Sequence, residues 1–444
     1  MDKISVIGGG FSGVEAAFAL ASHGFSVTLF EQKPAKYTPA HSYPGLCELV
    51  CSNSFKASRI NSAAGLLKAE MKLLGSLTVP VAESCAVPAG GALAVDRKAF
   101  SDAITLKIAA HPLITVENYE ITEIPDGNVI IATGPLTDGG LAESIQKVLS
   151  AAKCTASGAE TAGNSGEFLH FFDAAAPIIT AESIDMNTAF FGARYGRGED
   201  DYINCPFNEK ADYERFINAL ITAESAPKHE IDRVYEGCMP IEVLAKRGFD
   251  APRFGPLKPV GFTDPVTGRR PYALVQLRKE TSEGRLYNIV GFQTNLKFGE
   301  QERVFRLIPG LQNAEFARYG VMHRNSFIDS PRLLNADFSL RKDGRIIFAG
   351  QISGVEGYME SAASGLIAGI SLARKLADKP PLLLPKTTMT GALTAYISDE
   401  SVKKFEPMGA NMGILPPLCE PIKGKQERYQ ALADRAIADL ERIL

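Results

Sequence analysis

Two cysteines of this 444-residue chain stand where a thiol could act as a nucleophile. Cys51 lies in ELVCSNSFKA, between an apolar run and a small polar cluster, and Cys238 precedes Met-Pro and a helical pattern that starts at Ile241. Each is expected beside the start of a helix, where the pKa of a thiol falls and the reactive thiolate becomes more abundant. The alternative for each is small buried filler. Cys85 and Cys205 have similar loop settings, so local sequence does not rank the thiols.

The full set of cysteines indicates the redox state of the cellular compartment and whether a metal site is expected. The chain has an odd, scattered set of seven: Cys47, Cys51, Cys85, Cys154, Cys205, Cys238 and Cys419. Such a set argues against a disulfide framework and predicts a reducing cytoplasm. We expect no metal site, because no Cys or His cluster has zinc spacing. We also expect no export signal and no membrane span, since no apolar run approaches about 20 residues.

The first thirty residues predict the elements that would position a dinucleotide. A short buried strand at Ile4–Ile7 leads into Gly8, Gly10 and Gly13, which fit G-x-G-x-x-G, and an Ala-rich helix follows. The glycines permit the tight turn, the backbone approach to a pyrophosphate and close helix packing, and the helix N-terminus offers free N–H groups. Glu31 ends the second strand, where a carboxylate can accept hydrogen bonds from ribose.

Two later stretches favour FAD as that dinucleotide. NVIIATGPLT (128–137) is an apolar strand ending in Ala-Thr-Gly, and 344–376 predict a strand, a glycine-punctuated loop and a long small-residue helix. Such a helix can aim its N-terminus at the flavin edge where negative charge accumulates on reduction. An ordinary strand–helix unit is the alternative. The predicted cofactor-binding residues are Gly8, Gly9, Gly10, Phe11, Ser12, Gly13, Glu31, Gly134, Gly350, Gly354 and Gly357.

These elements predict an α/β protein with a discontinuous Rossmann-like FAD-binding domain and an inserted α+β domain. We expect the FAD-binding domain at 1–186 and 311–444, and the insertion, on the RNA or substrate side, at 187–310. The net charge of −4 gives no global attraction to nucleic acid. Residues 246–297, however, hold ten Lys or Arg against four acids, which fits either a solvated mixed face or a phosphate-contacting surface.

Ordered motifs run through nearly the whole chain, from Ile4 to about Pro417. They include TPAH (38–41), ELVCSNS (48–54), VPAGGALAVDR (87–97), FFDAAAPI (171–178), GCMPIE (237–242), GPLKPVGFTDPVTG (255–268) and GQISGVEGYMESAASG (350–365). On these motifs the chain resembles the folate- and FAD-dependent tRNA uracil-5-methyltransferases, the TrmFO family, which are related to larger GidA-type flavoproteins. The stretch around 154–166 is longer than usual in that family.

The resemblance implies a specific reaction. FAD is reduced by NADPH or NADH, 5,10-methylenetetrahydrofolate supplies one carbon, and C5 of a T-loop uridine in tRNA receives it as methyl. Uracil C5 becomes nucleophilic only after a thiolate adds at C6, and a base must later remove the C5 proton. The family's two functional cysteines map onto Cys51 and Cys238, and we favour Cys238 as nucleophile and Cys51 as its flavin-side partner. His41 and His323 lie in matching motifs and would contact flavin, folate or RNA, or be structural.

The resemblance also favours a phosphate-contacting role for the basic stretch. The predicted RNA-binding residues are Arg194, Arg197, Lys246, Arg247, Arg253 and Lys258. The expected partners are tRNA and reduced folate, with no membrane and no obligate protein partner. The alternatives are the same chemistry on ribosomal RNA, a GidA-like enzyme acting on wobble uridine, an NAD(P)H–flavin reductase without RNA, and a non-catalytic flavoprotein that binds RNA or folate.

Overall fold

The structure is a computed structural model that describes residues 3–151, 168–196, 202–226, 233–234 and 239–444. Its first sheet is built from both ends of the chain and is parallel except for the edge strand β17. In order across the sheet, the strands are β17 (Ser339–Leu340), β18 (Asp343–Phe348), β7 (Asn128–Ile131), β1 (Ile4–Ile7), β2 (Val27–Phe30) and β6 (Ile114–Glu117). All four residues of the central strand β1 are buried, as expected for a parallel strand with neighbours on both sides.

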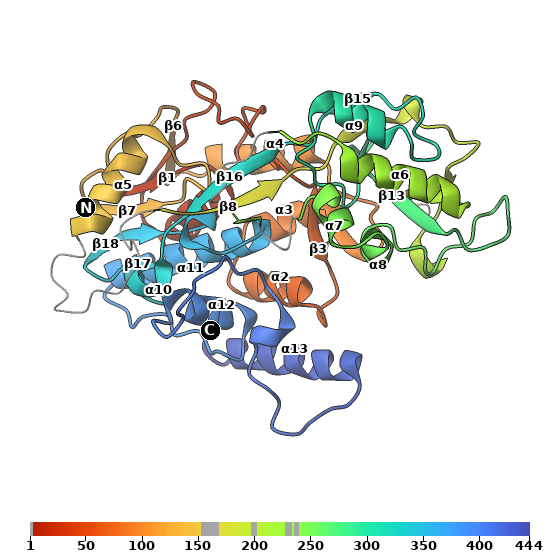
Figure 1. The fold of residues 1–444 in the computed structure, drawn as a ribbon. Helices are drawn as coiled ribbons and strands as arrows, with labels where there is room; N and C mark the ends of the chain where they lie inside the picture. Colours follow the sequence, from red (N-terminus) through yellow and green to blue (C-terminus); the bar gives the residue numbers. More distant parts are fainter. Residues whose placement is uncertain (1–2, 152–167, 197–201, 227–232, 235–238) are drawn as a thin grey trace.

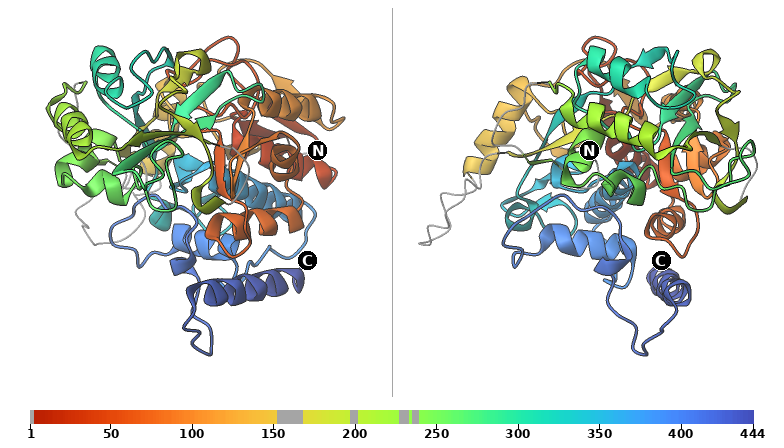
Figure 2. Two further views of the ribbon diagram at one scale, coloured as in Figure 1. Left: turned by 90° about the vertical axis from the view of Figure 1, so that its right-hand side faces the viewer. Right: turned by 45° about the vertical axis from the view of Figure 1, so that its right-hand side comes forward.

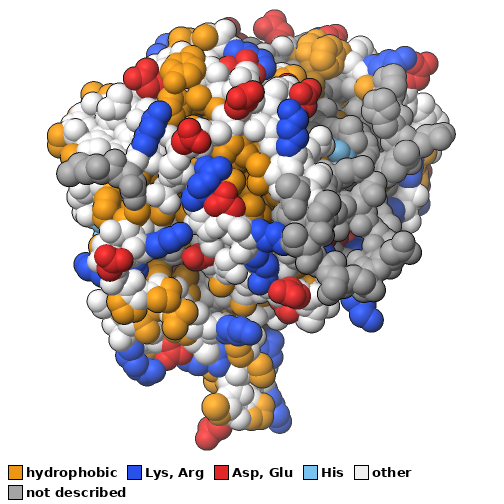
Figure 3. All heavy atoms as spheres, turned by 90° about the vertical axis from the view of Figure 1, so that its left-hand side faces the viewer, with side chains coloured by type: hydrophobic (Ala, Val, Ile, Leu, Met, Phe, Trp, Pro, Cys, Tyr) orange, Lys and Arg blue, Asp and Glu red, His pale blue; other side chains and the backbone are white. Residues whose placement is uncertain are grey.

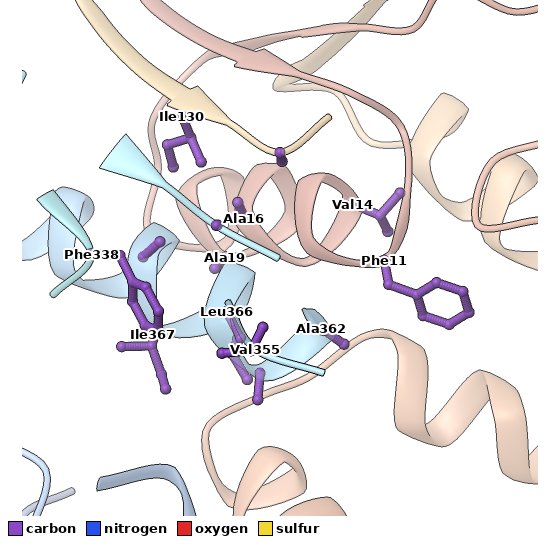
Figure 4. Packing of buried hydrophobic residues seen from close by; sticks show 14 of the residues in the cluster. Phe11, Val14, Ala16, Ala19, Ile130, Phe338, Val355, Ala362, Leu366 and Ile367 are labelled. Atoms are coloured by element: carbon purple, nitrogen blue, oxygen red, sulfur yellow. The ribbon is translucent and has the colours of Figure 1, made fainter. Parts of the chain in front are cut away.

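Helices α1 (Phe11–Ser22) and α11 (Tyr358–Leu376) cross at close range beside this sheet (Figure 4). Glycines allow the approach: a Cβ at Gly365 would lie 2.0 Å from the carbonyl oxygen of Ser12, and one at Gly369 would lie 2.7 Å from that of Ala16. Apolar side chains from both helices, including Val14 and Leu366, fill the core around the crossing. The contact fixes the N-terminus of α1 beside the loop that precedes α11.

The other helices of this part surround the first sheet and its core (Figure 1). They are α2 (Ala63–Leu73), α3 (Thr78–Ser84), α4 (Arg97–Ala109), α5 (Gly139–Ala151), α10 (Ser330–Leu333), α12 (Met389–Ser398) and α13 (Lys425–Glu441). Two three-stranded sheets accompany them: β3 (Ser54–Ala57), β5 (Ala92–Val95) and β4 (Ala86–Val87), and β12 (Arg233–Val234), β8 (Leu169–Ala174) and β16 (Met322–Phe327).

A second six-stranded sheet is antiparallel and has its own hydrophobic core. Its strands in order are β10 (Phe190–Phe191), β11 (Tyr202–Phe207), β13 (Ala273–Lys279), β14 (Leu286–Ile289), β9 (Ile178–Thr180) and β15 (Phe316–Arg318). Four helices belong to this unit: α6 (Lys210–Thr222), α7 (Ile241–Arg247), α8 (Ala251–Phe254) and α9 (Phe298–Phe305). Both views of Figure 2 show the blue helix α13 at the bottom of the molecule, below the green helices of this unit.

The predicted fold class is therefore confirmed: a mostly parallel sheet from both ends of the chain carries an inserted α+β unit. The division at 186/187 and 310/311 stays a proposal. The second sheet takes in β9 and β15, which lie just outside 187–310 in the sequence.

Glu70 on α2 joins the two ends of the chain by capping α12. Its buried carboxylate accepts hydrogen bonds from the backbone N–H groups of Met389 and Thr390, at 2.7 and 2.8 Å, and from the Thr390 hydroxyl. These are the first N–H groups of the helix, which have no partner within it. Burial raises the pKa of Glu70 to about 7 from an ordinary value of 4.5.

This carboxyl should make stability depend on pH. The native state holds the Glu70 proton more tightly than the unfolded state, so the free energy of unfolding should fall by about 3 kcal/mol between pH 4.5 and pH 7. Glu70→Gln cannot ionise, and the thermal midpoint of this variant should fall less than that of the wild type over this range. Equal falls in both proteins would contradict the assignment.

Candidate active site

A cleft opens at the carboxyl ends of β1, β2 and β7, where the first sheet meets the N-terminus of α1. It encloses about 1250 Å³, counting the part that is open to solvent. Ligands of open α/β sheets bind at this position. Of the predicted cofactor-binding residues, those that line the cleft are Gly8, Gly9, Gly10, Phe11, Ser12, Glu31 and Gly134.

The three motif glycines do different jobs. Gly8 has a φ of +103°, and a Cβ there would lie 2.5 Å from the Ala132 carbonyl oxygen. A Cβ at Gly13 would lie 1.8 Å from the carbonyl oxygen of Gly8. A Cβ at Gly10 would meet no atom within 4 Å, so the space beside this glycine is open toward the cleft. Gly8 and Gly13 thus serve the chain's own packing, and Gly10 leaves room for a ligand at the start of α1.

Glu31 stands at the other side of this turn as an oriented acceptor. Its carboxylate accepts hydrogen bonds from the backbone N–H groups of Gly9 and Lys33, each at 2.9 Å. The side chain is buried but lines the cleft. A carboxylate has about four acceptor positions, so lone pairs remain for the hydroxyl groups of a ribose. The open space at Gly10, the helix N-terminus and this acceptor together fit a dinucleotide.

The predicted glycines near the C-terminal end of the chain lie next to residues of the cleft but not in its lining. Gly350, Gly354 and Gly357 have φ angles of +84°, +83° and +120°, which side chains rarely adopt. None of the three lines the cleft; the nearby residues Gln351, Tyr358 and Ser361 do. Sequence reasoning selected the glycines because their spacing stands out. The polar neighbours carried no separate signal, although they lie in the same motif.

The cleft is also lined by His41, which the sequence analysis considered, and by Cys47, which it did not single out. His41 lines it and shares a hydrogen bond of 2.6 Å with the Thr38 hydroxyl. Burial, followed by the charge of Lys33, lowers the pKa of His41, which favours the neutral ring. Cys47 also lines the cleft, but it is fully buried, and burial raises its thiol pKa well above the ordinary range. The His323 side chain lies outside what the structure describes.

Cys51 lies at the edge of the cleft against Tyr358. Its backbone N–H donates to the Tyr358 hydroxyl oxygen at 2.9 Å, and its Sγ lies 3.1 Å from the same oxygen. The Tyr358 ring packs on Phe11, with ring centres 4.9 Å apart. Burial raises the pKa of Tyr358 well above its ordinary value, so the hydroxyl stays protonated and can donate a hydrogen bond to the sulfur. The arrangement joins a partly exposed thiol to a residue of the cleft.

The other described cysteines have different surroundings. Cys205 is fully buried in the second core, and burial raises its thiol pKa far above the ordinary value. Cys85 packs against the first core and does not line the cleft. The predicted partner thiol, Cys238, lies outside the described residues. Cys51 is thus the partly exposed thiol that the described part of the chain places beside the cleft.

One expectation for Cys51 is wrong. No helix follows it directly along the chain; strand β3 begins three residues later at Ser54, and the thiol contacts the hydroxyl of Tyr358, the first residue of α11. Positive charge also comes from Arg97, Arg278 and Arg318, each of which interacts electrostatically with Cys51. Such neighbours favour the thiolate form. Sequence reasoning missed Arg97 and Arg318, because neither lies near Cys51 along the chain.

A network across the two units holds the Cys51 loop in place. The Arg278 guanidinium on β13 donates to Asn53 Oδ1 and to Ser52 Oγ, both at 2.9 Å. Asn53 in turn donates to the carbonyl oxygen of Lys279 at 2.9 Å. Arg97, at the start of α4, forms an ion pair with Glu280, which directly follows β13. The loop that carries Cys51 is therefore fixed to the second sheet as well as to the first unit.

The predicted RNA-binding residues that the structure describes do not line the cleft. The Arg194 guanidinium donates to the carbonyl oxygens of Val260 and Lys258, and that of Arg253 donates to the Tyr272 carbonyl and the Asp250 carboxylate. Both guanidinium groups are thus engaged within the fold. The side chains of Lys246, Arg247 and Lys258 are at least partly exposed, and Arg197 lies outside the described residues.

The surface shown in Figure 3 lies at the far end from the second sheet. On the coloured part of this face, side chains of both charges are interspersed.

Within the described residues, no group of three or more His, Cys, Asp or Glu side chains is placed to hold a metal ion. Among the described helices, none is long and apolar enough to cross a membrane.

Comparisons with known proteins agree with this geometry. The family model "Glucose inhibited division protein A" matches residues 3–380. The chain is 54% identical to the methylenetetrahydrofolate--tRNA-(uracil-5-)-methyltransferase TrmFO of Acetivibrio thermocellus, over 99% of this chain and 98% of the relative. It is 53% identical to the protein of the same name from Moorella thermoacetica, over 98% and 97%. A structure of Aquifex aeolicus GidA superposes with a TM-score of 0.70 at 14% identity, covering 100% of this chain and 73% of that one.

Proposed function

The chain belongs to the TrmFO family, and we propose on that premise that it transfers a one-carbon unit from 5,10-methylenetetrahydrofolate to C5 of a uridine in tRNA. The observation that carries the proposal is the Cys51–Tyr358 pair at the edge of a cleft shaped for a dinucleotide. A thiol in this position fits the base that must remove the C5 proton after the new carbon–carbon bond has formed.

The cleft residues support FAD as the dinucleotide. The first-turn N–H groups of α1 and the open space at Gly10 would hold the pyrophosphate, and Glu31 would hold the ribose. The chemistry that FAD supplies when bound is the hydride that completes the methyl group, with NADPH or NADH as the source of electrons. A reaction of this kind belongs in the cytoplasm, where folate, reductant and tRNA meet.

We assign the two thiols different tasks. Cys238 as thiolate adds to C6 of uracil, and Cys51 accepts the proton that leaves C5 after the carbon–carbon bond has formed. The Tyr358 hydroxyl orients the Cys51 sulfur, and the neighbouring arginines favour its thiolate form. The side chains of Lys246, Arg247 and Lys258 on the inserted unit are proposed contacts to RNA phosphates.

Tyr358→Phe should separate orientation of the thiol from flavin binding. The variant loses the hydroxyl that contacts both the Cys51 N–H and Sγ but keeps the ring that packs on Phe11. Loss of a hydrogen bond to a charged group predicts a fall in kcat of about 10- to 100-fold, with full flavin content. Tyr396→Phe is the matched control, because its hydroxyl donates to the Glu406 carbonyl outside the cleft. An unchanged kcat in Tyr358→Phe would remove the tyrosine from the mechanism.

The proposed function is tested directly by following the carbon. Purified flavin-loaded protein is incubated with NADPH, carbon-labelled methylenetetrahydrofolate and unmodified tRNA or ribosomal RNA transcripts, and labelled 5-methyluridine is mapped. We expect label at one uridine of the tRNA T-loop. Label in ribosomal RNA alone would show that the substrate is ribosomal RNA and not tRNA. Label at a wobble uridine would favour GidA-like chemistry, and label arriving from S-adenosylmethionine would refute the proposal. Flavin reduction without any RNA labelling would identify a reductase.

A further inference from the structure

Arg318, the last residue of β15, has buried guanidinium nitrogens that nothing in the described part of the chain satisfies. Its Nε and Nη2 are both buried and have no hydrogen-bond partner among the described residues. The two other arginines that interact with Cys51 differ: Arg278 donates to Asn53 and Ser52, and Arg97 donates to Glu280 and the Leu49 carbonyl. An unmade hydrogen bond on a buried charged group is costly, so such a group calls for a partner from outside this part of the chain.

The surroundings of Arg318 define what that partner must be. The charged and titratable groups that act on its guanidinium are Arg97, Glu280, Tyr358 and Cys51. The Glu280 carboxylate is already bound by Arg97. Positive charge is therefore in excess at this point, beside Cys51 and Tyr358, and the orphaned donors favour an oxygen that carries negative charge. Tyr358 also lines the cleft, so one of the groups that act on Arg318 faces the space where a ligand would bind.

We propose that Arg318 binds the O4 carbonyl oxygen of the substrate uracil and stabilises it as an enolate. This inference rests on the proposed function. When a thiolate forms its bond from sulfur to C6, the electron pair of the C5–C6 double bond moves between C4 and C5, and the C4 carbonyl pair moves onto O4. No atom leaves and no redox change occurs, so the whole charge of the thiolate arrives on O4. Two N–H donors fixed in a dry site are suited to that oxygen.

Arg318→Met tests the assignment, because it keeps an unbranched side chain of similar reach and removes both donors. The rate of tritium release from C5-tritiated uridine is measured in single turnovers with tRNA transcript, flavin-loaded enzyme, NADPH and methylenetetrahydrofolate. Removing one oxyanion donor usually slows such a step by about 10²- to 10³-fold, and we expect a loss of that size. Flavin content and the Kd for the transcript should remain near wild-type values.

Thermal midpoints distinguish this role from a structural one. Since the Arg318 donors have no partner in the described part of the chain, Arg318→Met should leave the midpoint unchanged or raise it. Arg278→Met is the matched comparison and should lower the midpoint, because it removes hydrogen bonds to Asn53 and Ser52. Arg318→Lys, which keeps the positive charge but loses the planar guanidinium with its paired N–H donors, should retain part of the tritium-release rate.

The inference is overturned if Arg318→Met releases tritium at nearly the wild-type rate, or if its midpoint falls as far as that of Arg278→Met. It is also overturned if the variant loses its flavin, or if the slower rate is restored by raising folate alone, because the partner would then be cofactor or folate. A wild-type protein that fails to label tRNA would refute the proposed function instead.

Discussion

Replacing Cys51 with alanine is expected to lower the rate of methyl transfer by about 10²- to 10⁴-fold, the range seen when a positioned proton acceptor is removed. The thiol is partly exposed and touches Tyr358 at the cleft edge, so its removal takes away a reactive group and little packing. Flavin content should stay at the wild-type level. Transfer is measured as labelled 5-methyluridine formed per flavin-loaded enzyme.

The two cysteine variants should fail at different points. With Cys51→Ala, a covalent bond between protein and a 5-fluorouridine tRNA should still form, because the thiol assigned to C6 is present. With Cys238→Ala, that adduct should be absent. The reverse pattern would exchange the two roles, and adduct formation in both variants would exclude both thiols as the nucleophile.

Cys205→Ala is the control for the loss of a thiol as such. Its sulfur is fully buried in the second core, and the raised pKa keeps it protonated. This substitution should cost about 1–2 kcal/mol of stability through the cavity it leaves. It should not change the rate of methyl transfer. If Cys205→Ala lost as much methyl transfer as Cys51→Ala, both substitutions would be acting by disturbing the folded structure and not by removing a reactive thiol.

Gly10→Val is expected to give a folded, colourless protein without methyl transfer. Gly10 precedes α1 with a φ of −78° and ψ of −171°, which valine can adopt, and a Cβ there meets no atom within 4 Å. The added methyl groups would instead occupy the space proposed for the pyrophosphate. Flavin absorbance after purification, with the thermal midpoint of the same sample, measures both parts of the expectation. A yellow variant would refute the pyrophosphate assignment.

Two further glycines make this result specific. A Cβ at Gly299, in α9, would also meet no atom within 4 Å, so Gly299→Val should keep the flavin. Gly13→Val should instead fail to fold, because its Cβ would lie 1.8 Å from the carbonyl oxygen of Gly8. Loss of flavin from a folded protein only in Gly10→Val would therefore come from the ligand site and not from general damage to a glycine position.

Much of the fold could be predicted from the sequence because its signals are local. Strand β1, the turn at Gly8 and helix α1 follow one another within about twenty residues, and the helical pattern of α7 is equally compact. Glycines at positive φ and apolar periodicity act within a few residues, so they can be recognised without knowing their neighbours in space. The glycine turn before α1 and the position of Glu31 directly after β2 were predicted on this basis.

The chemistry around Cys51 depends on contacts that no local pattern contains. Tyr358 is 307 residues away from Cys51 along the chain, and Asn53 is 226 residues from the Lys279 carbonyl that it contacts. Sequence alone therefore left four thiols unranked and expected a helix at Cys51 where β3 follows.

The sequence by itself determined the architecture, the glycine turn before α1 and, through its ordered motifs, the family. Only the tertiary structure decided which described thiol lies at the cleft, which arginines surround it, and that Arg318 brings unsatisfied donors there. The physical reason is that backbone conformation follows from neighbours along the chain. Burial, charge and hydrogen-bond partners follow from whichever distant segments the packed sheets and helices bring together.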